Sequence, residues 1–278
     1  GRNPETIHNY GQKLNQLVRE GVDLLNPEAV KGYLANKEGW SNSSKHFAAT
    51  VYDGFLKFHG LTWEKPGYKI IRKLPFIPLE KELDALIAST GKTTSTMLQI
   101  LKETGMRIGE ALSLEWTDVD FERNVITLNQ PEKGSLPRIF KVSQTLIGKI
   151  NQLPKTTEHI FTNQIRQSVS ANFRSQRKRI AHKLGNPRLD KITFHTFRHW
   201  KATMEYAKTR DILHVMQLLG HKNIRNTLIY TQLAKIEKND EFYSATAKIT
   251  EEAKQLVEDG FEYVCTTPEE LMLFRKRK

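Results

Sequence analysis

Apolar residues recur at helical spacing along most of the chain, which predicts a mainly helical protein. In the first sixty residues, Tyr10, Leu14 and Leu17 share one helical face. Asn26 followed by Pro27 is typical of an N-cap and the first turn of a second helix, and a third helix is predicted to end at Gly60. Further helices are predicted over 79–89, 97–101, 146–153, 168–184, 193–202 and 211–219.

Two short segments alternate between apolar and polar residues, as β-strands do. They run over 124–128 and 138–142, and the Lys133–Gly134 pair between them predicts a turn. The two segments are therefore expected to form a β-hairpin. The predicted fold class is mainly α with a small antiparallel β-sheet.

Residues 62–78 interrupt any regular element and form the best domain boundary. Pro66, Gly67, Pro75 and Pro78 punctuate this stretch, which is also basic. We therefore divide the chain into a helical module over 1–62, a basic linker over 63–78, a larger domain over 79–235 and a tail over 236–278.

The tail is expected to combine a helix with a hairpin. Residues 234–260 are strongly charged and mostly helical in pattern, whereas 261–265 and 271–274 alternate around Pro268. Its length and amphipathic pattern suit a contact with a neighbouring copy of the chain.

The charge of the chain is concentrated in one segment. The formal net charge is +12, and residues 133–201 contain fifteen Lys and Arg against two acids. A concentrated basic face suits a polyphosphate ligand, because each neutralised phosphate releases condensed counterions. RNA, an anionic membrane or a solvated surface would fit the charge alone equally well.

Two groups of basic residues are the candidate DNA contacts. The linker residues could lie along a phosphate backbone, and the helix over 168–184 could lie in a groove. Either group could also be a solvated surface. The candidates are Lys65, Lys69, Arg72 and Lys73 in the linker, and Arg174, Arg177, Lys178 and Arg179 on the helix.

Several classes of protein are excluded by composition. The single cysteine, Cys265, excludes an internal disulfide framework and a Cys-rich zinc site. No apolar run approaches the ~18 residues of a membrane span, and no secretory signal is visible at the start. The chain begins with Gly, so the natural N-terminus could lie further upstream. A cytoplasmic or nucleoid setting without membrane contact is therefore expected.

A set of polar residues stands out from the helical core pattern. His195 and Arg198 lie three residues apart, His221 follows a Leu-Gly pair, and Tyr230 comes shortly after. Arg107 begins an earlier predicted helix. Cleavage of a phosphodiester by a protein needs a nucleophile, cationic donors for the phosphate oxygens and a proton for the leaving oxygen. These residue types can meet those needs.

The ordered set resembles the tyrosine recombinase or phage integrase family. The resemblance covers roughly residues 80–235, and the helical N-terminal module looks like the core-binding domain of that family. It is carried by Arg107 in TGMRIGEAL, Lys133 in the predicted hairpin, His195 and Arg198 in HTFRH, His221 in LGH and Tyr230 in IYTQL.

The resemblance implies a role for each residue around the phosphate. Arg107 and Arg198 would clamp the scissile phosphate, and Lys133 would protonate the 5′ oxygen. His195 would act in proton transfer with the nucleophile, and His221 would donate a hydrogen bond to the phosphate. Such a reaction needs neither metal nor ATP.

Tyr230 would be the nucleophile. Its attack would leave a 3′-phosphotyrosyl bond and a free 5′ hydroxyl on double-stranded DNA. Strand exchange would then require four protomers around two duplexes, although the protein could be a monomer when free in solution.

Residue-level alternatives remain open. Arg107 could merely pair with Glu110, and Lys141 could replace Lys133. The rival phenols to Tyr230 are Tyr206 and Tyr243. His199 is interpreted as structural, whereas His195 and His221 could be a helix cap and a turn residue.

Among functions, we favour integration or excision of a mobile element, because the final segment resembles the ends of archaeal integrases. The alternatives are a recombinase that resolves chromosome dimers, a type IB topoisomerase and a DNA-binding protein without catalysis.

Overall fold

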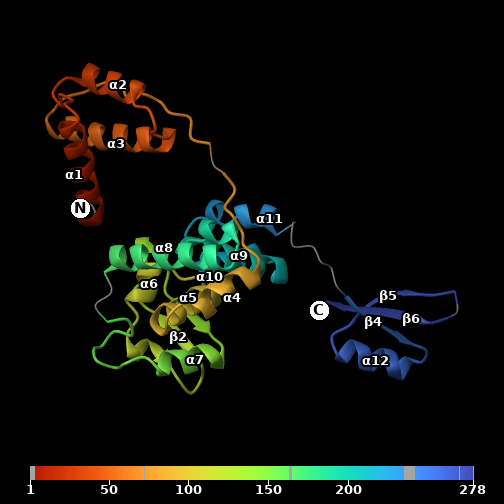
Figure 1. The fold of residues 1–278 in the computed structure, drawn as a ribbon. Coiled ribbons are helices and arrows are strands. Elements are labelled where there is room, and N and C mark those ends of the chain that lie inside the picture. The colour runs from red at the N-terminus through yellow and green to blue at the C-terminus, as the bar shows by residue number, and fades with distance from the viewer. Residues whose placement is uncertain (1–3, 72, 163–164, 235–241, 269, 278) are drawn as a thin grey trace. The chain divides into compact units, whose positions relative to one another are not determined.

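The computed structural model describes residues 4–71, 73–162, 165–234, 242–268 and 270–277 (Figure 1). The chain divides into two compact units, Gly1–Lys73 and Leu74–Lys278, and each is described by itself. Most described residues are helical and two small sheets are antiparallel, so the predicted fold class is confirmed. The boundary between the units falls within the segment predicted to be a linker.

The first unit contains three helices, α1 (Pro4–Arg19), α2 (Pro27–Asn36) and α3 (Asn42–Phe58). The predicted N-cap of α2 is confirmed, because Asn26 Oδ1 accepts hydrogen bonds from two backbone N–H groups of the first turn. Tyr52 is fully buried among these helices, and its hydroxyl donates to the Leu24 carbonyl at 2.9 Å.

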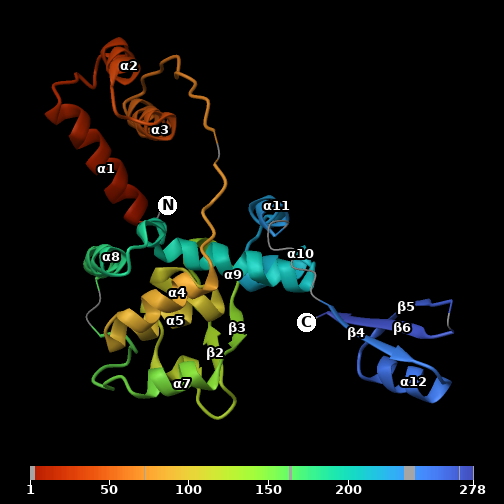
Figure 2. The same cartoon turned by 45° about the vertical axis from the view of Figure 1, so that its right-hand side comes forward.

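The second unit is built around one long helix, α9 (Phe194–Thr209). It contacts α5, α10 and α11, which bring residues that are far apart in sequence to one place (Figures 1 and 2). The other helices of this part are α4 (Glu80–Ser89), α5 (Lys92–Thr104), α6 (Ile108–Leu112), α7 (Gln144–Asn151), α8 (Arg166–Lys183), α10 (Ile212–Leu219) and α11 (Ile229–Leu233), with short 3-10 turns η1 (Trp116–Asp118), η2 (Glu132–Gly134), η3 (Pro187–Lys191) and η4 (Ile224–Asn226).

The sheet beside these helices has the order β1 (Val119–Asp120), β2 (Val125–Leu128), β3 (Arg138–Lys141). The predicted hairpin is confirmed as β2 and β3, which pair Leu128 with Arg138, and β1 is an additional strand. Ile126 and Phe140 face each other and are buried, whereas Ile139 between them is exposed. The turn η2 joins the two strands and holds Lys133.

The C-terminal region differs from its prediction. Residues 242–247 form a strand, β4 (Phe242–Ala247), where a helix was expected, and α12 (Thr250–Glu258) is helical as predicted. Residues 235–241 of the predicted helix lie outside the described residues. The predicted hairpin is confirmed as β5 (Glu262–Thr266) and β6 (Met272–Arg277), and β4 pairs with β6 on its other side. A strand that pairs with residues about thirty positions away gives no strong local signal, which is why the helical pattern misled.

Gly220 ends α10 as predicted, through a Schellman motif. The His221 N–H donates to the Met216 carbonyl at 3.0 Å, and the Gly220 N–H donates to the Gln217 carbonyl at 2.9 Å. Gly220 has a φ of 65°, and a Cβ there would lie 3.1 Å from the Leu136 carbonyl oxygen and from Arg138 Cδ. Glycine is therefore required by both conformation and space.

Gly220→Ala should lower the free energy of unfolding by at least ~1 kcal/mol, because a left-handed conformation is strained for a residue with a Cβ. Gly148 lies inside α7 with no atom within 4 Å of a built Cβ. Gly148→Ala is therefore the control and should raise stability by about 0.5–1 kcal/mol. Urea unfolding followed by circular dichroism measures both, and equal effects of the two substitutions would contradict this account of Gly220.

Candidate active site

Arg198 is a deeply buried charge of the site, with 1% of its surface exposed. Its Nη1 donates to the Gly105 carbonyl at 2.8 Å, and its Nη2 donates to the Leu219 carbonyl at 2.6 Å. These carbonyls lie at the C-terminal ends of α5 and α10, where helices leave carbonyls unpaired. Burial, together with the charge of Arg107, lowers the pKa of Arg198 to about 10, so it stays protonated at neutral pH.

A fully buried carboxylate, Glu110, organises the neighbouring arginines. It accepts from Arg107 Nη1 at 2.8 Å and from the Arg107 backbone N–H at 2.8 Å. Arg138 Nη2 lies 2.7 Å from the same carboxylate, as an ion pair rather than an aligned hydrogen bond. Burial favours the neutral acid. However, the Arg107 N–H and the charges of Arg138 and Arg107 hold the pKa of Glu110 below its ordinary value.

The charges in this buried region do not balance within the protein. Arg107, Arg138 and Arg198 interact with one another and with the single carboxylate of Glu110. Three guanidiniums around Glu110 leave an excess of positive charge there, and the further carboxylate nearby, that of Glu132 against Gly109, also lies close to Arg166. An anion is the natural complement of such a region.

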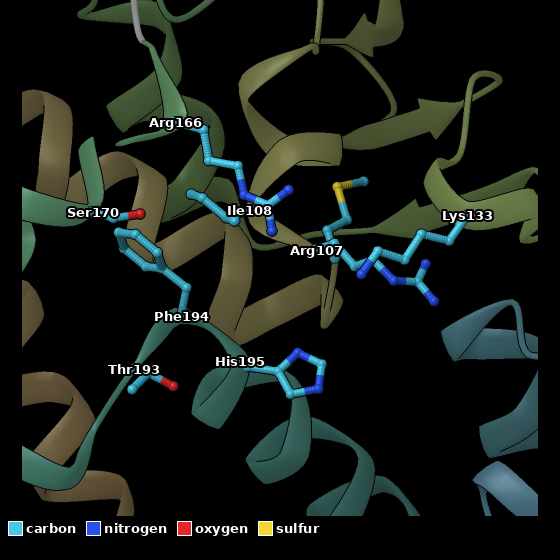
Figure 3. A pocket seen from close by; sticks show the side chains of 9 residues that line it. Arg107, Ile108, Lys133, Arg166, Ser170, Thr193, Phe194 and His195 are labelled. Carbon is cyan, nitrogen blue, oxygen red and sulfur yellow. The ribbon is translucent and has the colours of Figure 1, made fainter. Parts of the chain in front are cut away.

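A cavity of about 420 Å³ opens beside these arginines (Figure 3). Arg107, Lys133 and His195 come from three separate segments and surround the same opening. Lys133 is exposed and adopts a left-handed conformation, with a φ of 56°, in η2. The other lining residues are Met106, Ile108, Arg166, Ser170, Thr193 and Phe194.

The two predicted histidines of the site are held neutral at pH 7. Burial and the charges of Arg198 and Arg107 lower the pKa of His195, and Lys133 adds to this effect. Burial, Arg198 and Arg107 also lower the pKa of His221, to about 4. The Nδ1 of His221 lies 2.9 Å from the Thr227 hydroxyl, which fixes the ring after the turn at Gly220.

Tyr230 lies on α11 and is 2% exposed. Burial raises the pKa of its phenol to about 12, although Arg198 and Arg107 act in the opposite direction. The helix α11 packs directly on α9, which carries Arg198. The structure thus brings all six predicted catalytic residues into one region of the second unit. Arg107, Lys133 and His195 line the cavity, whereas Arg198, His221 and Tyr230 do not.

His199 was interpreted from the sequence as structural, yet it contacts the phenol. Its Nδ1 lies 3.1 Å from Tyr230 Oη. Its ring also packs edge-to-face on His195, with centroids 4.6 Å apart. The four-residue spacing of His195 and His199 on one helix face was the signal available in the sequence. The sequence pattern also did not predict Arg138 and Ser135, whose contacts are distant in sequence, or Thr227, which contacts His221 six positions away.

The rival residues differ from Tyr230 in their surroundings. Tyr206 is only partly buried and packs against the apolar cluster of α9, α10 and α11 that contains Tyr230, and Tyr243 lies on β4 with 55% of its surface exposed. Lys141 is exposed on β3 and does not line the cavity, whereas Lys133 does.

Most of the candidate DNA contacts are exposed, but one of them is bound to other residues of the protein. Arg177 is turned inward, where it donates to the Ile192 carbonyl and lies 3.9 Å from Asp190. Arg72 lies outside the described residues. The exposed candidates are Lys65, Lys69 and Lys73 in the first unit, and Arg174, Lys178 and Arg179 on α8.

Neither a metal site nor a membrane span is found in the part of the chain that the structure describes. No group of three or more His, Cys, Asp or Glu residues in the described ranges could hold a metal ion. Among the helices that the structure describes, none has the length and apolar character needed to cross a membrane.

Glu110→Gln should lower the free energy of unfolding at pH 7 by about 3 kcal/mol, because it leaves buried guanidiniums without their counter-charge. The folded-state pKa of Glu110 lies below its ordinary value near 4.5. The stabilisation by ionised Glu110 is therefore complete above the ordinary pKa of a glutamate. It is lost as the pH falls through the lower pKa of Glu110 in the folded protein. Urea unfolding from pH 7 to pH 3 should show the two proteins converging in acid. Glu122→Gln at an exposed site is the control, and a Glu110→Gln protein as stable as the parent at pH 7 would contradict this account.

Known proteins are similar to this chain in sequence and in fold. The tyrosine recombinase XerA of Pyrococcus horikoshii is 27% identical to this chain, and the match covers 84% of this chain and 85% of that protein. XerA of Saccharolobus solfataricus is 28% identical, and the match covers 80% of this chain and 75% of that protein. The fold is shared with the integrase of transposon Tn1549 in complex with transposon right-end DNA, with a TM-score of 0.63 and 16% identity. The match covers 87% of this chain and 95% of that chain. The fold is also shared with a λ integrase dimer bound to a core site, with a TM-score of 0.63 and 16% identity. That match covers 83% of this chain and 89% of the λ integrase chain. Residues 79–237, more than half of the sequence, match the profile of the phage integrase family, and the chain therefore belongs to this family of tyrosine recombinases.

Proposed function

We propose that this protein recombines DNA at specific sites by cleaving and rejoining strands through a covalent bond between Tyr230 and a 3′ phosphate. The observation that carries the proposal is the group of guanidiniums held by Glu110 and by the end of α10, beside α9, the helix on which the helix of Tyr230 packs. A phosphodiester is an anion that carries more negative charge as it reacts. The guanidiniums are already in place before that charge develops, so little reorganisation is needed.

In the proposed reaction, Arg107 and Arg198 bind the non-bridging oxygens of the scissile phosphate. Guanidiniums suit this role because their planar N–H groups match phosphate geometry. Glu110 orients Arg107, and the Gly105 and Leu219 carbonyls orient Arg198. Held in this way, both side chains lose little freedom when DNA binds.

Lys133 is the proposed proton donor to the leaving 5′ oxygen, since it is exposed beside the cavity. His195 acts in proton transfer, and His221 donates a hydrogen bond to the phosphate from its remaining ring nitrogen. The phosphotyrosyl bond keeps the energy of the broken bond, so the proposal needs neither ATP nor metal for rejoining.

Double-stranded DNA is the proposed partner. The exposed basic residues on α8 and the basic segment over 133–201 support it. Exchange of strands between two duplexes requires four copies of the chain, with the tail as the proposed contact between them. The first unit would complete the clamp around the duplex.

We further propose that the reaction integrates or excises a mobile element. Resolution of chromosome dimers is the alternative, and the sequence of the trapped DNA separates the two, because it identifies either the end of an element or a chromosomal site. Relaxation of supercoils at random sites by a lone protomer would instead indicate topoisomerase activity.

Tyr230→Phe should abolish covalent adducts with nicked duplexes in EDTA, measured on denaturing gels, because it removes the attacking oxygen and little volume. Tyr206→Phe and Tyr243→Phe should form adducts at the parent rate. Adducts that persist in Tyr230→Phe would show that another residue attacks. If the parent binds DNA without forming adducts, a DNA-binding protein without catalysis is the better description.

Replacement of Arg174, Lys178 and Arg179 by alanine should weaken DNA binding at all sequences alike. The slope of log Kd against log salt should fall by about 0.9 for each phosphate that the variant no longer neutralises. Lys92→Ala, at an exposed site on α5 outside the basic segment, is the control and should leave the slope unchanged. An unchanged slope in the triple variant would exclude α8 from the DNA interface.

A further inference from the structure

The imidazole of His199 lies between His195 and Tyr230. Its Nδ1 is 3.1 Å from the phenol oxygen, and its ring centroid is 5.9 Å from that of Tyr230. On its other side, it packs edge-to-face on His195, which lines the cavity. The three rings therefore form a row from the cavity to the buried phenol, and His199 is the member in direct contact with the nucleophilic oxygen.

The chemistry of this contact favours acceptance of a proton by His199. Burial, His195 and Arg198 lower the pKa of His199 to about 4, so its ring is neutral at pH 7. A neutral imidazole has one bare nitrogen, and a phenol in its ordinary protonated form donates a hydrogen bond to such an atom. The buried phenol has little access to water, so a neighbouring base is the available route for its proton.

We propose that His199 is a further catalytic residue, which takes the proton of Tyr230 during cleavage and returns it during rejoining. This inference rests on the proposed function. It differs from the assignment of this role to His195 alone, because His195 faces the cavity with Arg107 and Lys133 while His199 touches the reacting oxygen.

The residues of the site account for every proton and bond in cleavage and rejoining. As Tyr230 Oη bonds to phosphorus, its proton passes to His199 Nδ1. The bond between phosphorus and the 5′ oxygen breaks, and that oxygen takes a proton from Lys133. In rejoining, the 5′ hydroxyl gives its proton back to Lys133, and the released Tyr230 oxygen recovers its proton from His199. No oxidant, reductant or further reactant is required.

A bound phosphate would make this transfer easier. The imidazolium of His199 is disfavoured by the charge of Arg198 when no anion is present. A phosphate held by Arg198 supplies negative charge nearby, and more of it develops as the phosphate reacts. The nucleophile would therefore be activated mainly when DNA occupies the site.

The test is the single-turnover rate of adduct formation on two nicked substrates in EDTA. One has the ordinary 5′ oxygen at the scissile phosphate. The other has a 5′ sulfur, which leaves without needing a proton. His199→Asn keeps a polar amide near the position of Nδ1 but cannot take a proton, and His199→Ala removes the contact. Lys133→Ala is the matched control for the leaving group, and Tyr230→Phe is the control for the nucleophile.

We expect both His199 variants to react about 10²-fold more slowly with either substrate, as is common for loss of a general base. They should bind DNA as the parent does. The sulfur substrate should restore Lys133→Ala but neither His199 variant. Added imidazole should raise the rate of His199→Ala. This measurement still tests the inference if His199→Asn folds poorly.

Three results would overturn the inference. The first is a rate for His199→Asn within about threefold of the parent rate. The second is a return of the His199→Asn rate to the parent rate on the sulfur substrate. The third is a His199→Ala protein that binds DNA but whose rate does not rise when imidazole is added. Failure of the proposed function is distinguishable from all three, because the parent itself would then form no adduct that depends on Tyr230.

Discussion

The carbonyl of Leu219 accepts hydrogen bonds from two buried guanidiniums, Arg198 Nη2 and Arg138 Nη1, each at 2.6 Å. This carbonyl ends α10, and the turn that follows it places His221. Arg198 also holds the Gly105 carbonyl at the end of α5, just before Arg107. The free carbonyls of two helix ends thus fix one arginine, and that arginine fixes the spacing of the segments that form the site.

The same contacts leave the site short of negative charge. Glu110 is the carboxylate shared by Arg107 and Arg138, and it also lies within electrostatic range of Arg198. A buried region with this excess of cations is unfavourable by itself and is stabilised by an anion. In the proposed function, binding of phosphate would therefore also stabilise the site, which gives a reason for polar residues in the interior at this point. The buried phenol of Tyr230 fits this view, since burial raises its pKa to about 12 and so disfavours the reactive phenolate.

Local patterns in the sequence predicted much of this arrangement. The stop at Gly220, the N-cap at Asn26 and the pairing of Arg107 with Glu110 each depend on residues within four positions, and each is present. Contacts between distant segments were not predictable in this way. The role of Arg138 depends on a carbonyl 81 positions away, and β4 depends on pairing with β6. His199 illustrates both cases, because its place beside His195 was visible in the sequence, whereas its contact with Tyr230 required the packing of α11 on α9.

The central claim is that Tyr230 becomes covalently attached to DNA in a site built around Arg198. The most direct measurement is mass spectrometry of the trapped adduct after digestion with protease and nuclease. The account predicts a nucleotide joined through its 3′ phosphate to the peptide that contains Tyr230. A nucleotide on the peptide of Tyr206, Tyr243 or a serine, or one joined through its 5′ phosphate, would contradict it.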